Sequence, residues 1–173
     1  MKQATPLLIE RLYHKSPGAR RSICFLTGEI ARYYPEFFNN YLDKAIPTII
    51  SIITDENSRI DSSNSTATDN AVFSLGKIIE FCYEYIDIRL CLNTYLKGLP
   101  VAYDEYENVY KQVITFIQSK YLQNYFITSK EDVSHILESM NFMFERIDVR
   151  EDVMSISDFN IMVQETYPQF NTI

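Results

Sequence analysis

The chain repeats one apolar pattern in two segments, 16–34 and 66–83, and each pattern centres on a glycine. In both segments the apolar residues recur every three or four positions, which is the spacing of one face of an α-helix. Superimposing Gly28 on Gly76 brings further positions into register, namely Ile23 with Ala71, Leu26 with Ser74 and Ile30 with Ile78. Two helices that share one pattern predict a fold made of stacked copies of one unit.

A second apolar segment that carries a proline precedes each of these helices. Pro6 and Pro47 are 41 residues apart, inside the period of HEAT repeats, which is roughly 40–47 residues. We therefore predict an all-α fold, an α-solenoid or superhelix of HEAT repeats with about four helix pairs. The predicted repeats cover residues 4–35, 36–84, 86–119 and 120–173. Proteins of this kind serve as interaction scaffolds more often than as enzymes.

Local signals mark several helix ends. Ser16 before Pro17 predicts a helix N-terminus, because a hydroxyl at the N-cap and a proline at the first helical position are both favoured. The run from Ser129 to Asp132 resembles a capping box that opens another helix. In the helix that begins after Ser16, we expect Leu26 to belong to the apolar stripe that faces the core.

A proline and a polar stretch interrupt the middle of the chain. Pro47 lies inside an expected helix over 36–54 and predicts a kink or break there, because proline lacks an N–H and clashes with the preceding turn. Residues 55–65 are rich in Ser, Asn and acidic side chains without periodicity, so they predict a loop. The next helix is expected over about 67–83.

Charge is unevenly distributed along the chain, whose net charge is −7. Residues 1–60 carry eight basic and six acidic side chains, whereas residues 61–173 carry eight basic and seventeen acidic ones. An acidic surface repels phosphate backbones and attracts basic partners, so we predict no binding to nucleic acid. No apolar run approaches roughly 18 residues, so we predict no membrane insertion.

Neither the cysteines nor the histidines form a recognisable chemical motif. The cysteines are odd in number and lack CxxC spacing, which indicates buried reduced thiols and a reducing compartment; they are Cys24, Cys82 and Cys91. His14 and His135 are far apart and in no metal-ligand spacing, and the sequence has no nucleotide-binding or hydrolase motif. We therefore predict no catalytic residue, no metal and no cofactor, and we expect that the protein is not an enzyme.

Two runs of the sequence resemble a known family. They are Ser16-Pro17-Gly18-Ala19-Arg20 with Gly28, and Ala67-Thr68-Asp69-Asn70-Ala71-Val72 followed by Leu75-Gly76-Lys77-Ile78. In this order, with a Ser- and Asn-rich loop between them, they are similar to the C-terminal HEAT repeats of the karyopherin-β (importin-β) nuclear transport receptors. The importin-five, or karyopherin-β3, branch is the most similar. The resemblance is good over about residues 5–81, fair to about 118 and poor beyond.

This resemblance implies a nuclear import receptor that binds protein cargo with a basic localisation signal and carries it through the nuclear pore under Ran-GTP control. It also implies contacts with phenylalanine–glycine nucleoporins and shuttling between cytoplasm and nucleus. The main Ran-binding repeats of such receptors are N-terminal, so no Ran-binding residue is assigned, and we expect the chain to be a C-terminal segment of a longer protein. The alternative is a HEAT-repeat scaffold or regulatory subunit unrelated to nuclear transport.

In a HEAT solenoid the second helix of each pair lines the concave face. The residues expected there combine acidic side chains with an aromatic ring, and they are Asp69, Phe73, Lys77, Glu80 and Glu84, extended along the next inner helix by Glu105, Asn108 and Gln112. Such a stripe can hold a lysine or arginine of a cargo signal through charge and cation–π contacts. The same pattern also fits an ordinary solvent-exposed helix face.

Three further residues are predicted to be structural. Gly28 and Gly76 are expected to permit close approach of neighbouring helices. Asn70 precedes the buried Ala71 and is expected to form a hydrogen bond across to the neighbouring repeat.

Overall fold

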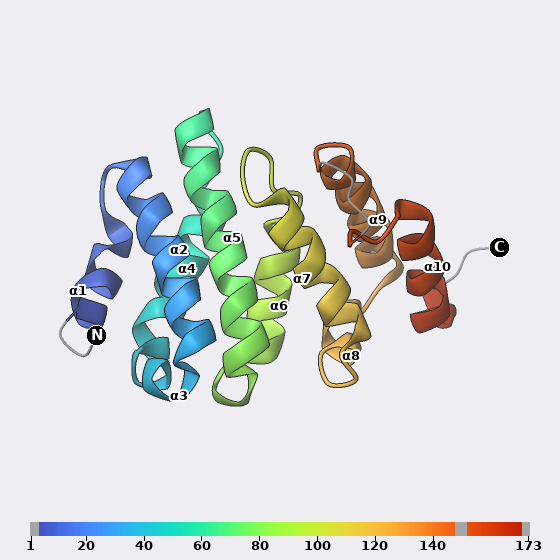
Figure 1. Cartoon of the computed structure of the whole chain (residues 1–173), viewed down its shortest axis with the longest axis horizontal. Coiled ribbons are helices and arrows are strands. Elements are labelled where there is room, and N and C mark those ends of the chain that lie inside the picture. Colours follow the sequence, from blue (N-terminus) through green and yellow to red (C-terminus); the bar gives the residue numbers. More distant parts are fainter. Residues whose placement is uncertain (1–3, 148–151, 171–173) are drawn as a thin grey trace.

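The chain is built of helices in the parts that the computed structural model describes, residues 4–147 and 152–170 (Figure 1). Within these two ranges there is no β-strand, and the helices pack beside one another from one end of the molecule to the other. The prediction of an all-α, solenoid-like fold is confirmed.

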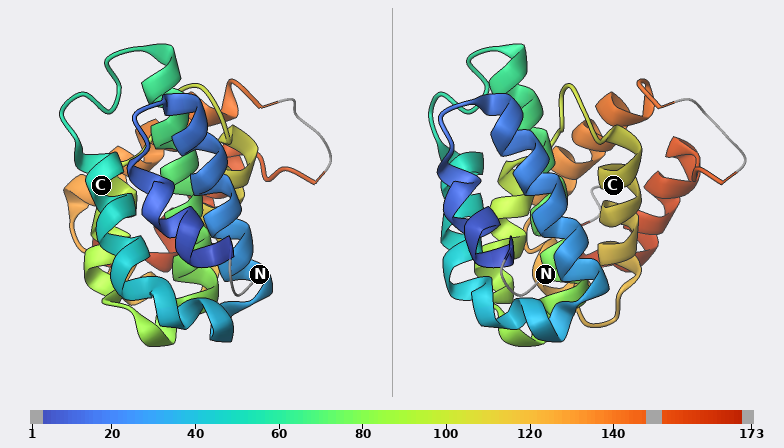
Figure 2. Two further views of the ribbon diagram at one scale, coloured as in Figure 1. Left: turned by 90° about the vertical axis from the view of Figure 1, so that its left-hand side faces the viewer. Right: turned by 60° about the vertical axis from the view of Figure 1, so that its left-hand side comes forward.

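Two layers of helices make up most of the molecule. One layer lies nearer the viewer in Figure 1, and the other lies behind it. The nearer layer consists of α2 (Pro17–Tyr33), α5 (Ser62–Cys82) and α7 (Tyr106–Gln118), and the other of α4 (Leu42–Thr54) and α6 (Ile88–Lys97). Figure 2 shows both layers from the N-terminal end, where α1 (Ala4–Glu10) covers the edge of the stack. The α5 helix packs against α2 and α7 in its own layer and against α4 and α6 in the other, so it lies at the centre of the core.

The first three helix pairs follow the order expected of a repeat protein. The pairs α1–α2, α4–α5 and α6–α7 lie within the predicted repeats 4–35, 36–84 and 86–119. A short helix, α3 (Pro35–Phe38), and a 3-10 turn, Asn39–Tyr41, connect the first pair to the second. The repeat boundaries themselves stay a prediction.

The C-terminal part departs from this two-layer order. The short α8 (Gln123–Phe126) packs against α6, and α9 (Lys130–Phe144) packs against α7 and against α10 (Ile156–Thr166). Three further 3-10 turns complete the described elements, and they are Arg11–Tyr13, Tyr83–Tyr85 and Pro168–Phe170.

The helix break predicted at Pro47 lies elsewhere. α4 runs through Pro47 from Leu42 to Thr54, and the interruption is the 3-10 turn Asn39–Tyr41 that precedes α4. Pro47 lies in the second turn of α4, so its missing N–H deprives only the carbonyl of Asp43 of a helical donor. Both residues are exposed, so water can hydrogen-bond that carbonyl instead and the helix continues.

The predicted loop over 55–65 is shorter than expected. α5 begins at Ser62, because the carboxylate of Asp61 accepts a hydrogen bond from the backbone N–H of Asn64 at 2.8 Å and caps the helix. The loop therefore covers 55–61, and residues 62–65 form the first turn of α5.

The two predicted helix starts are present. Ser16 is the N-cap of α2 with Pro17 at the first helical position, although its hydroxyl makes no capping hydrogen bond. Ser129 and Asp132 form the complete capping box of α9, with the Asp132 N–H 3.1 Å from the Ser129 hydroxyl and the Ser129 N–H 2.9 Å from the Asp132 carboxylate. Both helix starts are thus confirmed.

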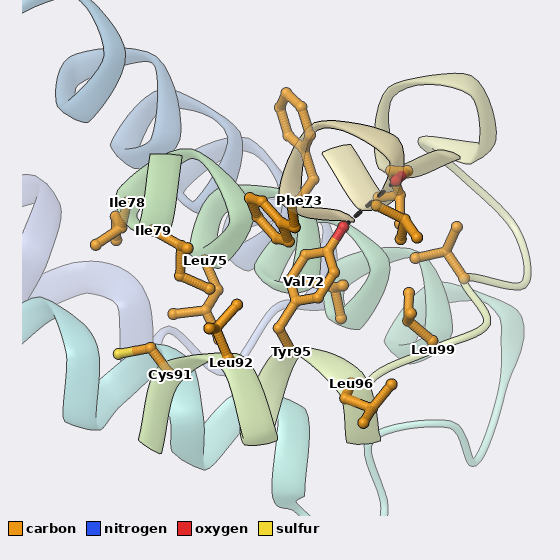
Figure 3. Packing of buried hydrophobic residues seen from close by; sticks show 14 of the residues in the cluster. Val72, Phe73, Leu75, Ile78, Ile79, Cys91, Leu92, Tyr95, Leu96 and Leu99 are labelled. Atoms are coloured by element: carbon orange, nitrogen blue, oxygen red, sulfur yellow. Dashed lines mark hydrogen bonds between the residues drawn. The ribbon is translucent and has the colours of Figure 1, made fainter. Parts of the chain in front are cut away.

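Apolar side chains of α5 and α6 meet in the middle of the core (Figure 3). Leu75 and Ile79 of α5 and Leu92 of α6 have no exposed surface. The ring of Tyr95 on α6 extends this core toward α7 through Phe116, with 5.1 Å between ring centroids. Burying such side chains contributes about 1.5–3 kcal/mol each, so this cluster is a main source of stability.

The three cysteines are free and buried, which confirms the prediction of buried reduced thiols. Burial raises the pKa of Cys24 and Cys91 to about 12 and that of Cys82 to about 11. Since the thiolate is the reactive form, these side chains are unreactive members of the core at neutral pH.

Gly28 and Gly76 both lie where one helix of the α2–α5–α7 layer meets the next. A Cβ atom at Gly28 would lie 3.0 Å from the Cα of Ser74 in α5, and one at Gly76 would lie 2.3 Å from Oε1 of Gln112 in α7. At either position a side chain would force its neighbour in the next helix to move. Each glycine thus allows the next helix of the layer to approach closely.

Replacing Gly76 by leucine should destabilise the protein. The new side chain would displace Gln112, which donates to the carbonyl of Phe73 and accepts from the hydroxyl of Tyr95. We expect a loss of roughly 1–3 kcal/mol in the free energy of unfolding, measured by denaturant melts. Gly18→Leu is the control, because only the Ser16 hydroxyl comes within 4 Å of a Cβ there. Equal midpoints for the two variants would contradict the close approach of α5 and α7.

Candidate functional site

The carboxylate of Asp69, in the first half of α5, is fully buried, and both of its oxygens accept hydrogen bonds. Oδ2 accepts hydrogen bonds from the successive backbone N–H groups of Ala102, Tyr103 and Asp104, at 3.0, 2.7 and 3.0 Å. Oδ1 lies 2.8 Å from Nη1 of Arg59. A buried carboxylate needs donors that replace its lost hydration, and these groups supply them. Asp69 therefore fixes the loop between α6 and α7 against α5.

Arg59 ties the loop over 55–61 to the same point. Its Nη2 donates to the carbonyl of Gly98, at the end of α6, at 3.0 Å. The hydroxyl of Thr68 on α5 donates to the carbonyl of Ser58 at 2.8 Å. The segment that the sequence predicts to be a polar loop is thus anchored to two neighbouring helices.

Asn70 makes a hydrogen bond across to the following helix pair, the kind of contact expected from the sequence. Its Nδ2 donates to the carbonyl of Thr66 and to Oδ2 of Asp104, both at 3.0 Å. The same Oδ2 of Asp104 lies 2.7 Å from Nη2 of Arg21 on α2. One carboxylate in the α6–α7 loop therefore joins α5 and α2, and neither Arg21 nor Asp104 carries a sequence signal for this role.

Three residues predicted to face a partner are buried. The exposed fractions of Asp69, Phe73 and Gln112 are 0, 3 and 5%, so the prediction is wrong for these residues. The ring of Phe73 stacks on Phe25 of α2, with centroids 5.9 Å apart. Gln112 of α7 donates to the carbonyl of Phe73 at 3.0 Å. The stripe on α5 faces its two neighbours in the layer, and helix packing covers these side chains where the sequence predicts solvent.

The other predicted residues of α5 do not form a continuous exposed row. The side chain of Lys77 is 12% exposed, with its ammonium 3.9 Å from the carboxylate of Glu29 and 5.2 Å from the centre of the Phe73 ring. Burial raises the pKa of Glu80, and nearby cations oppose the shift. Glu84 is exposed, just beyond the C-terminal end of α5.

A shallow hollow of about 450 Å³ opens between α2 and the start of α7. Phe25 and Leu26 are 39 and 45% exposed there, so the prediction that Leu26 faces the core is wrong. α2 buries the side that carries Thr27 and Gly28 and leaves Leu26 outside the stack. Polar and apolar side chains line the hollow together, and they are Arg21, Ser22, Phe25, Leu26, Asn70 and Glu105.

Glu105 has the most unusual backbone at this hollow. It precedes α7 with a φ of 61°, in the left-handed region, which costs a non-glycine residue roughly 1–2 kcal/mol. Its Oε2 accepts a hydrogen bond from Nδ2 of the exposed Asn108 at 2.6 Å. Burial raises the pKa of Glu105, while the bond from Asn108 opposes this shift. Of the eight predicted partner-binding residues, only Glu105 lines the hollow, and Asn108 adjoins it.

No family model matches the chain, and no solved structure matches it. Over residues 4–147 and 152–170, no three His, Cys, Asp or Glu side chains gather in a way that could hold a metal ion. In the same described part, no helix has the length and apolar character needed to span a bilayer.

Replacing Asp69 by asparagine should destabilise the fold strongly. The variant keeps the shape of the side chain but leaves the Arg59 guanidinium without its counter-charge. The new side-chain amide also turns an N–H group toward N–H donors that the carboxylate oxygens accept from in the wild-type protein. We expect a loss of roughly 3–5 kcal/mol in the free energy of unfolding, measured by urea denaturation. Asp43→Asn, the same change at an exposed position, is the control. A loss no larger than that of the control would show that the buried carboxylate is not needed.

Replacing Glu105 by glutamine should raise the melting temperature at pH 7. The pKa of Glu105 is raised in the folded state, so above this pKa the wild-type protein holds a carboxylate that folding has partly desolvated. As the pH falls through the folded-state pKa, the wild-type side chain takes up a proton and the advantage of glutamine should shrink. Thermal melts of both proteins between about pH 4 and pH 7 measure this. A variant that is less stable than wild type at pH 7 would contradict it.

Proposed function

We propose that this chain is a HEAT-repeat segment of a nuclear import receptor of the karyopherin-β kind, and that its α2–α5–α7 layer binds protein cargo. The observation that carries the proposal is the position of the run that resembles this family, residues 67–72 and 75–78, in the part of α5 between α2 and α7. Asp69 and Asn70 of this run hold the α6–α7 loop, so the resembling residues are those that fix how consecutive units stack.

The exposed side of the same layer supports a protein partner. Phe25 and Leu26 are large apolar side chains in contact with solvent, beside Arg21 and Glu105. Aromatic and arginine side chains are enriched in protein–protein interfaces, and a charged rim around apolar residues is typical of them. The acidic balance of residues 61–173 favours a basic partner.

Under this proposal the receptor shuttles between cytoplasm and nucleus, contacts phenylalanine–glycine nucleoporins, and releases cargo when Ran-GTP binds to repeats N-terminal to this segment. A HEAT-repeat scaffold unrelated to transport would share the fold and differ in its partners. Partner binding therefore separates the two functions.

The test uses the immobilised chain and two purified probes. One is a phenylalanine–glycine nucleoporin domain, and the other is a fluorescent protein fused to a lysine- and arginine-rich localisation peptide. We expect both to be retained at low salt, and the basic probe to be released near about 0.5 M salt, where the Debye length is only about 4–5 Å. A nucleoporin domain with its phenylalanines replaced by serine, and the fluorescent protein without the peptide, are the controls. Retention of neither probe above its control would contradict the proposal.

A further inference from the structure

Two polar groups that line the hollow keep an acceptor oxygen that has no donor within the described part of the chain. Asn70 is 1% exposed and uses both hydrogens of Nδ2, one on the carbonyl of Thr66 and one on Asp104. Because both of these partners are acceptors, the orientation of the amide is fixed and Oδ1 stays available. Glu105 accepts a side-chain hydrogen bond from Asn108 on Oε2, which leaves Oε1 available as well.

The arginine that lines the hollow is already engaged. The guanidinium of Arg21 lies 2.7 Å from Asp104, whose carboxylate also accepts from Asn70 and from the backbone N–H of Glu105. The side chain that donates to the carboxylate of Glu105 is thus a neutral amide, that of Asn108. A partly buried carboxylate is stabilised better by a cation. The hollow thus places the carboxylate of Glu105 and the amide oxygen of Asn70 beside two apolar side chains, Phe25 and Leu26.

We propose that this hollow binds an arginine side chain of a partner protein, with the guanidinium on Glu105 and Asn70 and the aliphatic stem on Phe25 and Leu26. A guanidinium carries several donors in one plane and can bond a carboxylate and an amide oxygen together. Its flat face also packs on an aromatic ring, and Phe25 is 39% exposed. A lysine ammonium is a single, strongly hydrated charge and fits this combination less well. The inference rests on the proposed function in one respect, that this layer binds proteins.

The first experiment maps binding of a short blocked peptide in which one arginine lies between two leucines. Heteronuclear NMR spectra of the isotope-labelled chain are recorded during titration with this peptide and with two matched peptides that carry lysine or glutamine instead. We expect the largest shifts at the side-chain amide of Asn70 and the backbone N–H groups of Leu26 and Glu105. The lysine peptide should bind several-fold more weakly, and the glutamine peptide should cause no such shifts. Shifts that map to another surface, or that are equal for all three peptides, would overturn the inference.

The second experiment tests separately the charged side chain of the hollow, Glu105, and its aromatic side chain, Phe25. Glu105→Gln keeps the shape and removes the charge, so it should weaken binding of the arginine peptide roughly tenfold, as expected for loss of a charge-assisted hydrogen bond. Phe25→Ala should weaken it several-fold. Glu138→Gln, the same change at an exposed position on α9, is the control and should bind as wild type does. Equal affinity for Glu105→Gln and wild type, or an equal loss for Glu138→Gln, would overturn the inference.

The same variants separate this inference from the proposed function. If nucleoporin and localisation-signal probes are retained but the arginine peptide causes no shifts at the hollow, the inference fails and the proposed function stands. If the peptide binds at the hollow in the manner described but neither probe is retained, the inference stands and the transport function fails.

Discussion

A buried carboxylate with donors on both oxygens determines how consecutive helix pairs meet. Asp69 belongs to α5, its three backbone donors belong to the α6–α7 loop, and Arg59 belongs to the loop before α5. An unpaired charge inside the stack would be costly, so both loops have to close on α5 together. Asn70 adds the next contact through Asp104 to α2. A single turn of α5 thus joins three successive units.

Most helices could be predicted because each depends on local patterns. Apolar spacing marks the buried sides of α5 and α7, and the capping box at Ser129 opens α9 as expected. Helix ends are harder to predict where polar residues cluster. Asp61 caps α5 from within a stretch rich in Ser and Asn, where any of several side chains could serve as the N-cap. The sequence therefore predicts a start near residue 67, about five residues after the observed one at Ser62.

The candidate site was harder to predict, because periodicity shows which residues share one side of a helix but not what covers that side. Asp69 and Phe73 form a row that is typical of a solvent-exposed face, yet α5 has a helix on both sides within its layer. The reverse error occurred at Leu26, an apolar residue that α2 leaves exposed. Glu105 has no local signal for its left-handed backbone, since glutamate does not favour that conformation. Its position follows from the bonds that hold the preceding residues to α5.

Amide hydrogen exchange at Ala102, Tyr103 and Asp104 tests most directly whether Asp69 holds the units together. Loop amides usually exchange rapidly because small local openings expose them to water. The hydrogen bonds to Asp69 predict that these three amides instead exchange slowly, at rates close to those of the central turns of α5, and that they lose protection together in Asp69→Asn. Exchange at the rate of an unfolded peptide in the wild-type protein would contradict this account.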